Sequence, residues 1–176
     1  MKQEALEVLK NRRSIRKFKA DQITKEELHT VLEAGTYAPT AAGTQAPFIV
    51  AIQNPETVAQ IDAMNARVLN APQMPHPYYG APTIILVFAP VDGHAPVADA
   101  SLVAGNMLNA AYAAGLGSCW IHRGKEMFES EEGKALMQSW GLPDHLICVS
   151  TIALGYSAGE QPIAAPRKSN YIIEID

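Results

Sequence analysis

Apolar residues recur with a helical period in several parts of the chain. The clearest case starts at Thr24, where Thr24 and Glu27 have the spacing of a capping box, a side-chain pair that satisfies the exposed amides of a helix start. Apolar positions then follow at three- and four-residue spacing towards Pro39. A shorter amphipathic segment begins at Ala5. The pattern therefore predicts one helix near the N-terminus and a second after residue 24.

Three later segments also carry helical patterns, over residues 55–68, 97–116 and 127–140. The last is charged and amphipathic, and Gly141 and Pro143 stop it. The middle one has no charge after Asp99 and is apolar nearly all round, so it must be buried, and in a small protein a subunit interface is the natural place. The proline-rich loop over 70–82 is a candidate lid, because loops of this length are usually functional.

Continuous apolar runs of strand length occupy residues 48–52, 83–89 and 147–154, and we expect them to be buried on both faces. A short strand follows Gly117. A long arm then leads to residues 171–175, which we expect to form an edge strand. Helices outnumber strands in this reading, so the fold class is α+β.

Composition and charge narrow the classes of function. The 176 residues fit one domain with a substantial core, and the net charge of -4 argues against general nucleic-acid binding, which needs a basic surface. No apolar run reaches the roughly 18 residues of a membrane span, and the chain opens on a charged helical pattern, so we expect a cytoplasmic protein. Cys119 and Cys148 lie in apolar contexts typical of buried, reduced thiols.

The candidate chemistry is concentrated in residues 11–18, where four cations accompany a hydroxyl. They are Arg12, Arg13, Arg16 and Lys17, with Ser14. Arginine suits phosphate because its planar fork gives bidentate, charge-assisted hydrogen bonds. In an extended segment Arg12, Ser14 and Arg16 point one way, whereas Arg13 and Ile15 point the other, so one face could hold a phosphate. The alternative is a solvated basic surface run, which is the usual setting of clustered charge.

Two further features bear on ligands. The residues between Pro39 and Pro47 are small and cannot form regular structure, and small side chains let a flat ligand approach the backbone closely. Cys119 and His122 have the spacing of half a metal site, but no second pair is nearby in sequence, and structural zinc requires four ligands. A thiol in an apolar strand is usually inert. We therefore expect neither a metal nor a cysteine nucleophile.

Five short motifs follow one another along the chain. They are residues 12–18 (RRSIRKF), 38–40 (APT) with Gln45, 79–82 (YGAP), 115–121 (GLGSCWI), and 155–156 (GY) with 166–168 (PRK). This ordered set resembles the nitroreductase family of FMN-dependent flavoproteins. The resemblance implies a single domain over residues 1–176, an α+β sandwich with a mixed sheet flanked by helices, and a homodimer with two FMN sites at the subunit boundary. It also implies a C-terminal arm, about 157–176, that reaches over the partner.

The resemblance assigns roles to individual residues. Arg12 and Ser14 match the phosphate and ribityl ligands, with Arg13 as a neighbour and Arg16 beside the pyrimidine edge of the flavin. The segment that the partner lays against the ring corresponds to Ala42, Gly43 and Gln45. The stretch whose backbone faces the ring corresponds to Cys119, Trp120, Ile121 and His122, and the closing phosphate contacts to Arg167 and Lys168. This chain departs from many members by having Gly43 in place of an asparagine and Ala46-Pro47-Phe48 where an aromatic soon follows the glutamine.

The function that the resemblance implies is an FMN-dependent oxidoreductase. NAD(P)H would reduce the flavin, and an acceptor such as a nitroaromatic or a quinone would then take the electrons in the same pocket, a ping-pong scheme. No catalytic side chain is expected, because the flavin supplies the reactive atom. A G-x-G-x-x-G fingerprint, the mark of a dedicated nicotinamide fold, is not present. The alternative is a flavin-binding sensor or FMN carrier without turnover.

Overall fold

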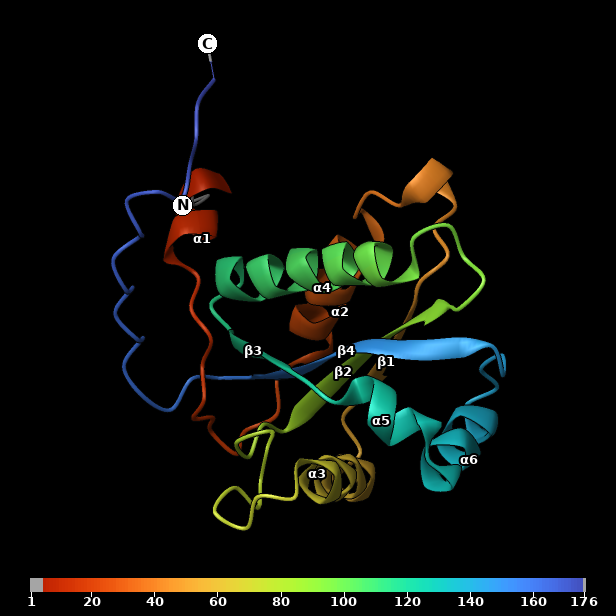
Figure 1. The fold of residues 1–176 in the computed structure, drawn as a ribbon. Helices are drawn as coiled ribbons and strands as arrows, with labels where there is room; N and C mark the ends of the chain where they lie inside the picture. The colour runs from red at the N-terminus through yellow and green to blue at the C-terminus, as the bar shows by residue number, and fades with distance from the viewer. Residues whose placement is uncertain (1–4, 176) are drawn as a thin grey trace.

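A computed structural model describes residues 5–175 (Figure 1). In chain order its elements are α1 (Ala5–Asn11), α2 (Lys25–Thr36), the 3₁₀ helix η1 (Ala41–Gly43), β1 (Phe48–Ile52), α3 (Pro55–Leu69), β2 (Thr83–Pro90), α4 (Pro96–Ala113), β3 (Gly117–Ile121), α5 (Gly124–Glu129), α6 (Glu131–Ser139) and β4 (Leu146–Gly155). Most of these bounds lie within a few residues of the predicted ones. The α+β class is confirmed.

The four strands form one sheet in the order β1-β2-β4-β3, and each neighbouring pair is antiparallel. β2 and β4 occupy its centre. β1 lies at an edge, so Phe48 is 39% exposed, contrary to the prediction that this run is buried on both faces. Parallel pairing, which a mixed sheet requires, occurs in the described part of the chain only as an isolated bridge between Ser14 and Ser118.

Helices cover both faces of the sheet (Figure 1), with α2 and α4 on one side and α3, α5 and α6 on the other. Successive residues of β2 alternate between two cores, as the pleat of a strand requires. Ile85 and Val87 pack with the α2 and α4 side, whereas Ile84 and Phe88 pack with the α3, α5 and α6 side. This two-sided core fixes the position of β3 and of its neighbouring segments.

The helices on the first face begin and pack largely as the sequence predicts. The capping box is present, because the Glu27 N–H donates to the Thr24 hydroxyl and the Thr24 N–H donates to the Glu27 carboxylate. α4 buries one side, but Leu102 on its outer side is 47% exposed. α4 is therefore covered only in part by its own chain.

Within residues 5–175, no helix combines the length and apolar character needed to cross a membrane.

The predicted helix over 127–140 is in fact two helices, α5 and α6. Ser130 adopts an extended conformation and accepts a hydrogen bond from the Gly133 N–H at 3.1 Å, so it ends one helix and caps the next. A Cβ at Gly133 would lie only 2.3 Å from the Met127 carbonyl oxygen. The close corner between α5 and α6 therefore requires glycine at this position.

Beyond β4 the chain forms an arm, residues 156–175, that has no helix or strand in its described part. Its first residues run beside residues 11–18, the basic segment, where the Ala158 N–H donates to the Lys17 carbonyl at 2.9 Å. Its end leaves the body of the molecule (Figure 1), and Ile172 and Ile173 are 75% and 82% exposed. The predicted edge strand at 171–175 is therefore wrong for the single chain, because its backbone meets no strand there.

Candidate functional site

The basic segment lies along the free edge of the sheet, beside β3. The Ile15 N–H donates to the Ser118 carbonyl at 3.0 Å, and Ser14 pairs with Ser118. Ile15 is buried against Gly117, where an added Cβ would come within 3.0 Å of the Ile15 side chain. Gly117 thus permits this close approach. The segment is extended and fixed in place, unlike a loose surface run.

The side chains of this segment divide between two faces, as the alternation predicts. Arg13 lines a cavity of about 340 Å³ that also borders the last turn of α4 and the start of the arm. The Ser14 hydroxyl instead lies beside the Cys119 thiol, and it and the charges of Arg16 and Arg12 all act on the pKa of that thiol. Arg12, Ser14 and Arg16 are therefore gathered at β3, and Arg13 faces away from them.

The arginines at this edge have no acidic partners among the described residues. Arg13 donates from Nη1 to the carbonyls of Lys10 and Arg12 at 2.7 Å each, contacts that satisfy the end of α1. Arg12 is half-buried and Arg16 is exposed. Unpaired guanidinium groups beside a hydroxyl form an arrangement suited to a phosphate group.

β3 itself carries polar groups that lack partners. Ser118 Oγ and Trp120 Nε1 are buried and make no hydrogen bond within residues 5–175. Burial raises the pKa of the Cys119 thiol, and the charge of Arg16 and the hydroxyl of Ser14 oppose that shift. Because the net shift is upward, the thiol is protonated at neutral pH and is a poor nucleophile. Ser118 and Trp120 alternate with Cys119 along the strand, so these unpaired groups lie on the face of β3 that Arg13 shares, opposite to Cys119.

β3 ends at Ile121 in a tight turn. Arg123 has φ 78°, a left-handed conformation that is uncommon outside glycine, and α5 starts directly after it. Asn65 of α3 is fully buried; its Nδ2 donates to the His122 carbonyl and its Oδ1 accepts from Arg123 Nε, both at 2.9 Å. The exposed His122 ring lies 6.3 Å from the Trp120 ring. Sequence reasoning missed Asn65, because no local pattern distinguishes it.

The loop that contains Ala42, Gly43 and Gln45 lies at the other end of α4. Their φ values are 53°, 65° and 50°, so left-handed backbone recurs here even at non-glycine positions. The loop is tied to the start of α4, where the Ala41 N–H donates to Asp99 at 2.9 Å. α4 has 18 residues, which gives it a length of about 27 Å. One chain therefore does not bring this loop to the basic segment.

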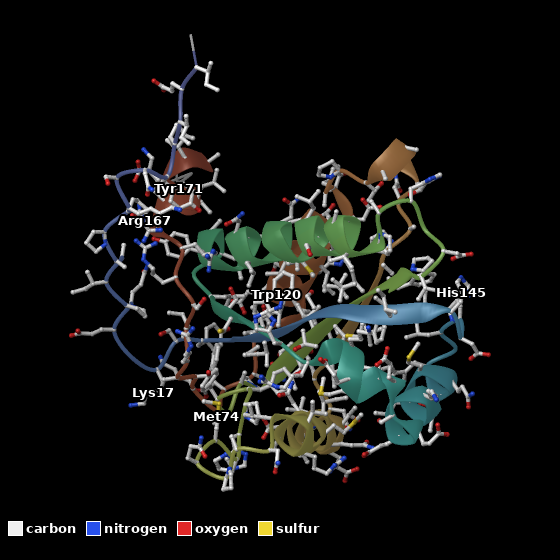
Figure 2. All side chains as sticks on the ribbon, viewed as in Figure 1. Lys17, Met74, Trp120, His145, Arg167 and Tyr171 are labelled. Carbon is white, nitrogen blue, oxygen red and sulfur yellow. The ribbon has the colours of Figure 1, made fainter. Side chains whose placement is uncertain are left out.

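Arg167 and Lys168 lie on the arm, and Arg167 lies on the same side of the molecule as α1 (Figure 2). Arg167 Nε donates to the Ala165 carbonyl at 3.2 Å, and the Lys168 ammonium group stands 5.3 Å from the Tyr171 ring centroid. These contacts are local to the arm. The structure therefore places both cations on the arm and does not bring them against the other predicted residues.

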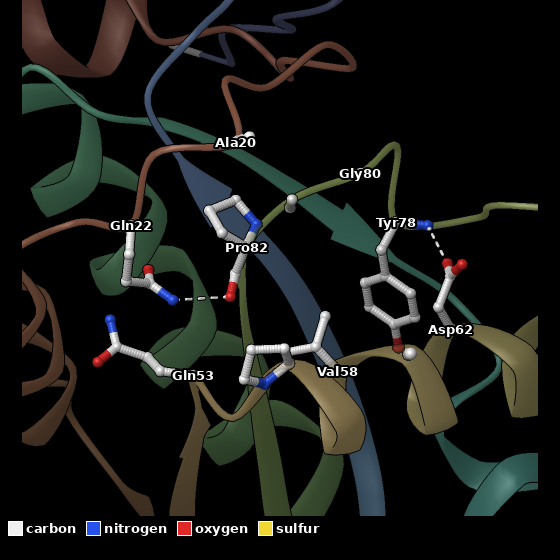
Figure 3. A pocket seen from close by; sticks show the side chains of 11 residues that line it. Ala20, Gln22, Gln53, Val58, Asp62, Tyr78, Gly80 and Pro82 are labelled. Carbon is white, nitrogen blue, oxygen red and sulfur yellow. Dashed lines mark hydrogen bonds between the residues drawn. The ribbon is translucent and has the colours of Figure 1, made fainter.

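A separate cavity of about 540 Å³ with mostly apolar walls borders α3 (Figure 3). On its wall the Asp62 carboxylate accepts the Tyr78 N–H at 3.0 Å and lies 2.8 Å from His76 Nδ1. The Gln22 side chain donates to the Pro82 carbonyl at 2.9 Å, closing another side. None of the predicted site residues lines this cavity. The charge is gathered instead at β3, which is therefore the candidate site.

Comparison with known proteins gives a consistent result. The sequence profile of the Nitroreductase family matches residues 9–156. A protein of Methanothermobacter thermautotrophicus named "Putative NADH dehydrogenase/NAD(P)H nitroreductase" is 30% identical over 166 residues, which cover 89% of this chain and 79% of that protein. A nitroreductase with bound FMN from Bacteroides fragilis has a TM-score of 0.88 at 28% identity, over 99% of this chain and 100% of its own. A second, from Desulfitobacterium hafniense, has a TM-score of 0.89 over the full length of both chains at 22% identity, which bears on the fold alone.

Proposed function

The chain belongs to the nitroreductase family, and on that premise we propose that it is an FMN-dependent oxidoreductase formed by a single domain over residues 1–176. The observation that carries the proposal is the group of Arg12, Ser14 and Arg16 beside Cys119, none of the arginines being paired with an acid in the described residues. This group lies in the motif that resembles the phosphate-binding segment of the family, which supports a phosphate-bearing cofactor at this strand edge.

The residues present fit FMN. Arg12 and Ser14 would hold its phosphate and ribityl chain, and the exposed Arg16 would stand beside the pyrimidine edge. The backbone of residues 119–122 would face the ring. When bound, FMN supplies the redox chemistry, so the chain itself needs no acid or nucleophile. The protonated Cys119 thiol agrees with that division of roles.

We assign NAD(P)H as the electron donor and a small acceptor, such as a nitroaromatic or a quinone, as the second substrate. The name of the Methanothermobacter thermautotrophicus relative, which includes both NADH dehydrogenase and NAD(P)H nitroreductase, supports the donor. If donor and acceptor use the same space over the cofactor, they must bind in turn. The proposal therefore includes ping-pong kinetics.

We further propose that a second copy of the chain completes the site. The loop with Ala42, Gly43 and Gln45 lies at one end of α4 and the basic segment at the other, so a two-fold pair with antiparallel α4 helices would bring the partner's loop to this segment. The exposed, uncharged outer side of α4 supports such packing. The proposed dimer also gives the apolar end of the arm, residues 171–175, a free strand edge at β1 of the partner.

Arg167 and Lys168 would move with the arm, and in the proposed dimer they would close on a phosphate. Their present contacts are compatible with this, because Arg167 is engaged only by a neighbouring carbonyl and Lys168 by a neighbouring ring. Both residues are exposed, so neither would have to break a buried interaction. The proposal thus uses every residue to which the resemblance assigns a role, with Arg13 as a neighbour on the opposite face.

The second candidate function is an FMN carrier or sensor without turnover. Anaerobic stopped-flow mixing of the FMN-loaded protein with NADH and then with NADPH separates the two. The oxidoreductase predicts that the visible absorption of oxidised flavin disappears within seconds with at least one nucleotide and returns when a quinone is added. Flavin that stays oxidised with both nucleotides would contradict the proposed function and favour the carrier.

A further inference from the structure

Three polar side chains lie deep in the apolar layer between the sheet and α3. Asn65 and Thr151 are 0% exposed and Tyr78 is 1% exposed. Burying a polar group in an apolar core is unfavourable unless it is hydrogen-bonded, and a core of this size can be filled by apolar residues alone. Their presence calls for a structural reason beyond packing, and their hydrogen bonds supply one.

All three side chains are connected to the end of β3. The Tyr78 hydroxyl donates to Thr151 Oγ1 at 2.8 Å, and Thr151 Oγ1 donates to the Ile121 carbonyl at 2.9 Å. Asn65 Nδ2 donates to the next carbonyl, that of His122, at 2.9 Å. The Asn65 side chain also lies beside the Tyr78 hydroxyl, where it opposes the rise that burial causes in the pKa of Tyr78. Two consecutive backbone carbonyls are therefore held from the interior by this network, one through Tyr78 and Thr151 and the other through Asn65.

The same network holds the strained residue that follows. Arg123 has φ 78° and ψ 13°, a left-handed conformation that costs a non-glycine residue free energy and persists only where its surroundings impose it. Arg123 Nε donates to Asn65 Oδ1 at 2.9 Å, so Asn65 contacts both sides of the turn. The turn joins β3 to α5, and its conformation depends on Asn65, which precedes His122 by 57 positions and Arg123 by 58.

We infer that Asn65, Tyr78 and Thr151 are positioning residues that fix the backbone of residues 121–123 for cofactor binding. The inference rests on the proposed function, because residues 119–122 are the stretch assigned to the flavin ring. Backbone that must meet a flat ring needs to be held within a fraction of an ångström by surrounding interactions. Loosening the turn lowers the fraction of chains ready to bind, and the apparent dissociation constant rises by the same factor.

The test compares variants that remove one hydroxyl each, using the full-length protein. Thr151→Val keeps the shape of the side chain and removes the donor to Ile121, and Ser150→Ala is the matched control, because Ser150 is equally buried and its hydroxyl has no partner in the described residues. Fluorescence titration should show that Thr151→Val raises the FMN dissociation constant by roughly 3- to 30-fold, the range expected from one buried hydrogen bond lost. Ser150→Ala should bind as wild type does.

A second pair keeps the test independent of folding problems at β4. Tyr78→Phe removes the hydroxyl at the head of the network, and Tyr79→Phe removes a hydroxyl that makes no hydrogen bond within residues 5–175. Tyr78→Phe should raise the FMN dissociation constant and change the visible absorption of bound flavin, whereas Tyr79→Phe should do neither. Asn65→Leu, which removes both contacts to the turn, should have the largest effect.

The outcomes are distinguishable. If wild-type protein binds no FMN, the proposed function fails and this inference fails with it. If wild type binds FMN and the three network variants bind it as tightly as the two controls, the proposed function stands and the inference is wrong. In that case a lowered melting temperature in the network variants would identify the network as a stabilising element only.

Discussion

Leu102 lies on the outer side of α4 and is 47% exposed in the single chain. Full burial of a leucine side chain is worth about 1.5 to 3 kcal/mol, so covering the exposed half in the proposed dimer would contribute about 1 kcal/mol per copy and about 2 kcal/mol per dimer. Leu102→Asp would lose this contribution and would also force two carboxylates out of water, at a cost of several kcal/mol per ion. A total above about 4 kcal/mol raises the dimer dissociation constant at least roughly 1,000-fold.

Sedimentation velocity over a range of protein concentrations measures this change directly. Leu6→Asp is the matched control, because Leu6 is a 62% exposed leucine on α1. Wild type and Leu6→Asp should sediment as dimers, and Leu102→Asp as a folded monomer with weak FMN binding. A wild-type monomer that binds FMN fully, or a Leu102→Asp protein that dimerises normally, would refute the reasoning. Aspartate at Leu108 would not serve, because Leu108 is 9% exposed and belongs to the chain's own core.

Three further predictions concern the site and the stability of the chain. Arg12→Ala should weaken FMN binding by about 1.5 to 3 kcal/mol, the range for a hydrogen bond to a charged group, as measured by fluorescence titration. The Tyr156 hydroxyl donates to Glu27 and lowers the pKa of that carboxyl below its usual 4.5, so this bond stabilises the fold above pH 4.5 and its contribution is lost as the pH falls through the lowered pKa. Thermal unfolding of Tyr156→Phe should therefore depend less on pH below 4.5 than that of wild type, and parallel curves would contradict this. Gly133→Ala should lower the melting temperature by several degrees, because its Cβ would meet the Met127 carbonyl at 2.3 Å; an unchanged melting temperature would contradict this.

Features that depend on nearby residues could be predicted from the sequence. The capping box at Thr24 and Glu27 is an example, since both partners lie within one turn of the same helix. The division of the basic segment into two faces could also be predicted, because side chains alternate along an extended segment, and the bridge between Ser14 and Ser118 keeps this segment extended. The identity of the cofactor came from the family resemblance, because no local pattern in the sequence distinguishes FMN from another phosphate-bearing ligand.

Features that depend on distant partners could not be predicted in this way. Asn65 meets the His122 carbonyl across 57 positions, and Tyr78 meets Thr151 across 73 positions, so neither contact leaves a periodic signal. The exposed edge position of β1 likewise depends on the order of strands in the sheet. The sequence predicts an edge strand at residues 171–175, but no strand in the described part of the same chain pairs with them.

The central claim is that residues 12–16 and β3 form an FMN site that turns over with a nicotinamide donor. The most direct measurement is to reconstitute the purified protein, identify and quantify the released cofactor by chromatography, and follow the flavin absorption while NADH or NADPH and then a quinone are added. The account predicts one FMN per chain, loss of the oxidised absorption with at least one nucleotide, and its return with the quinone. Finding FAD, no cofactor, or FMN that neither nucleotide reduces would contradict it.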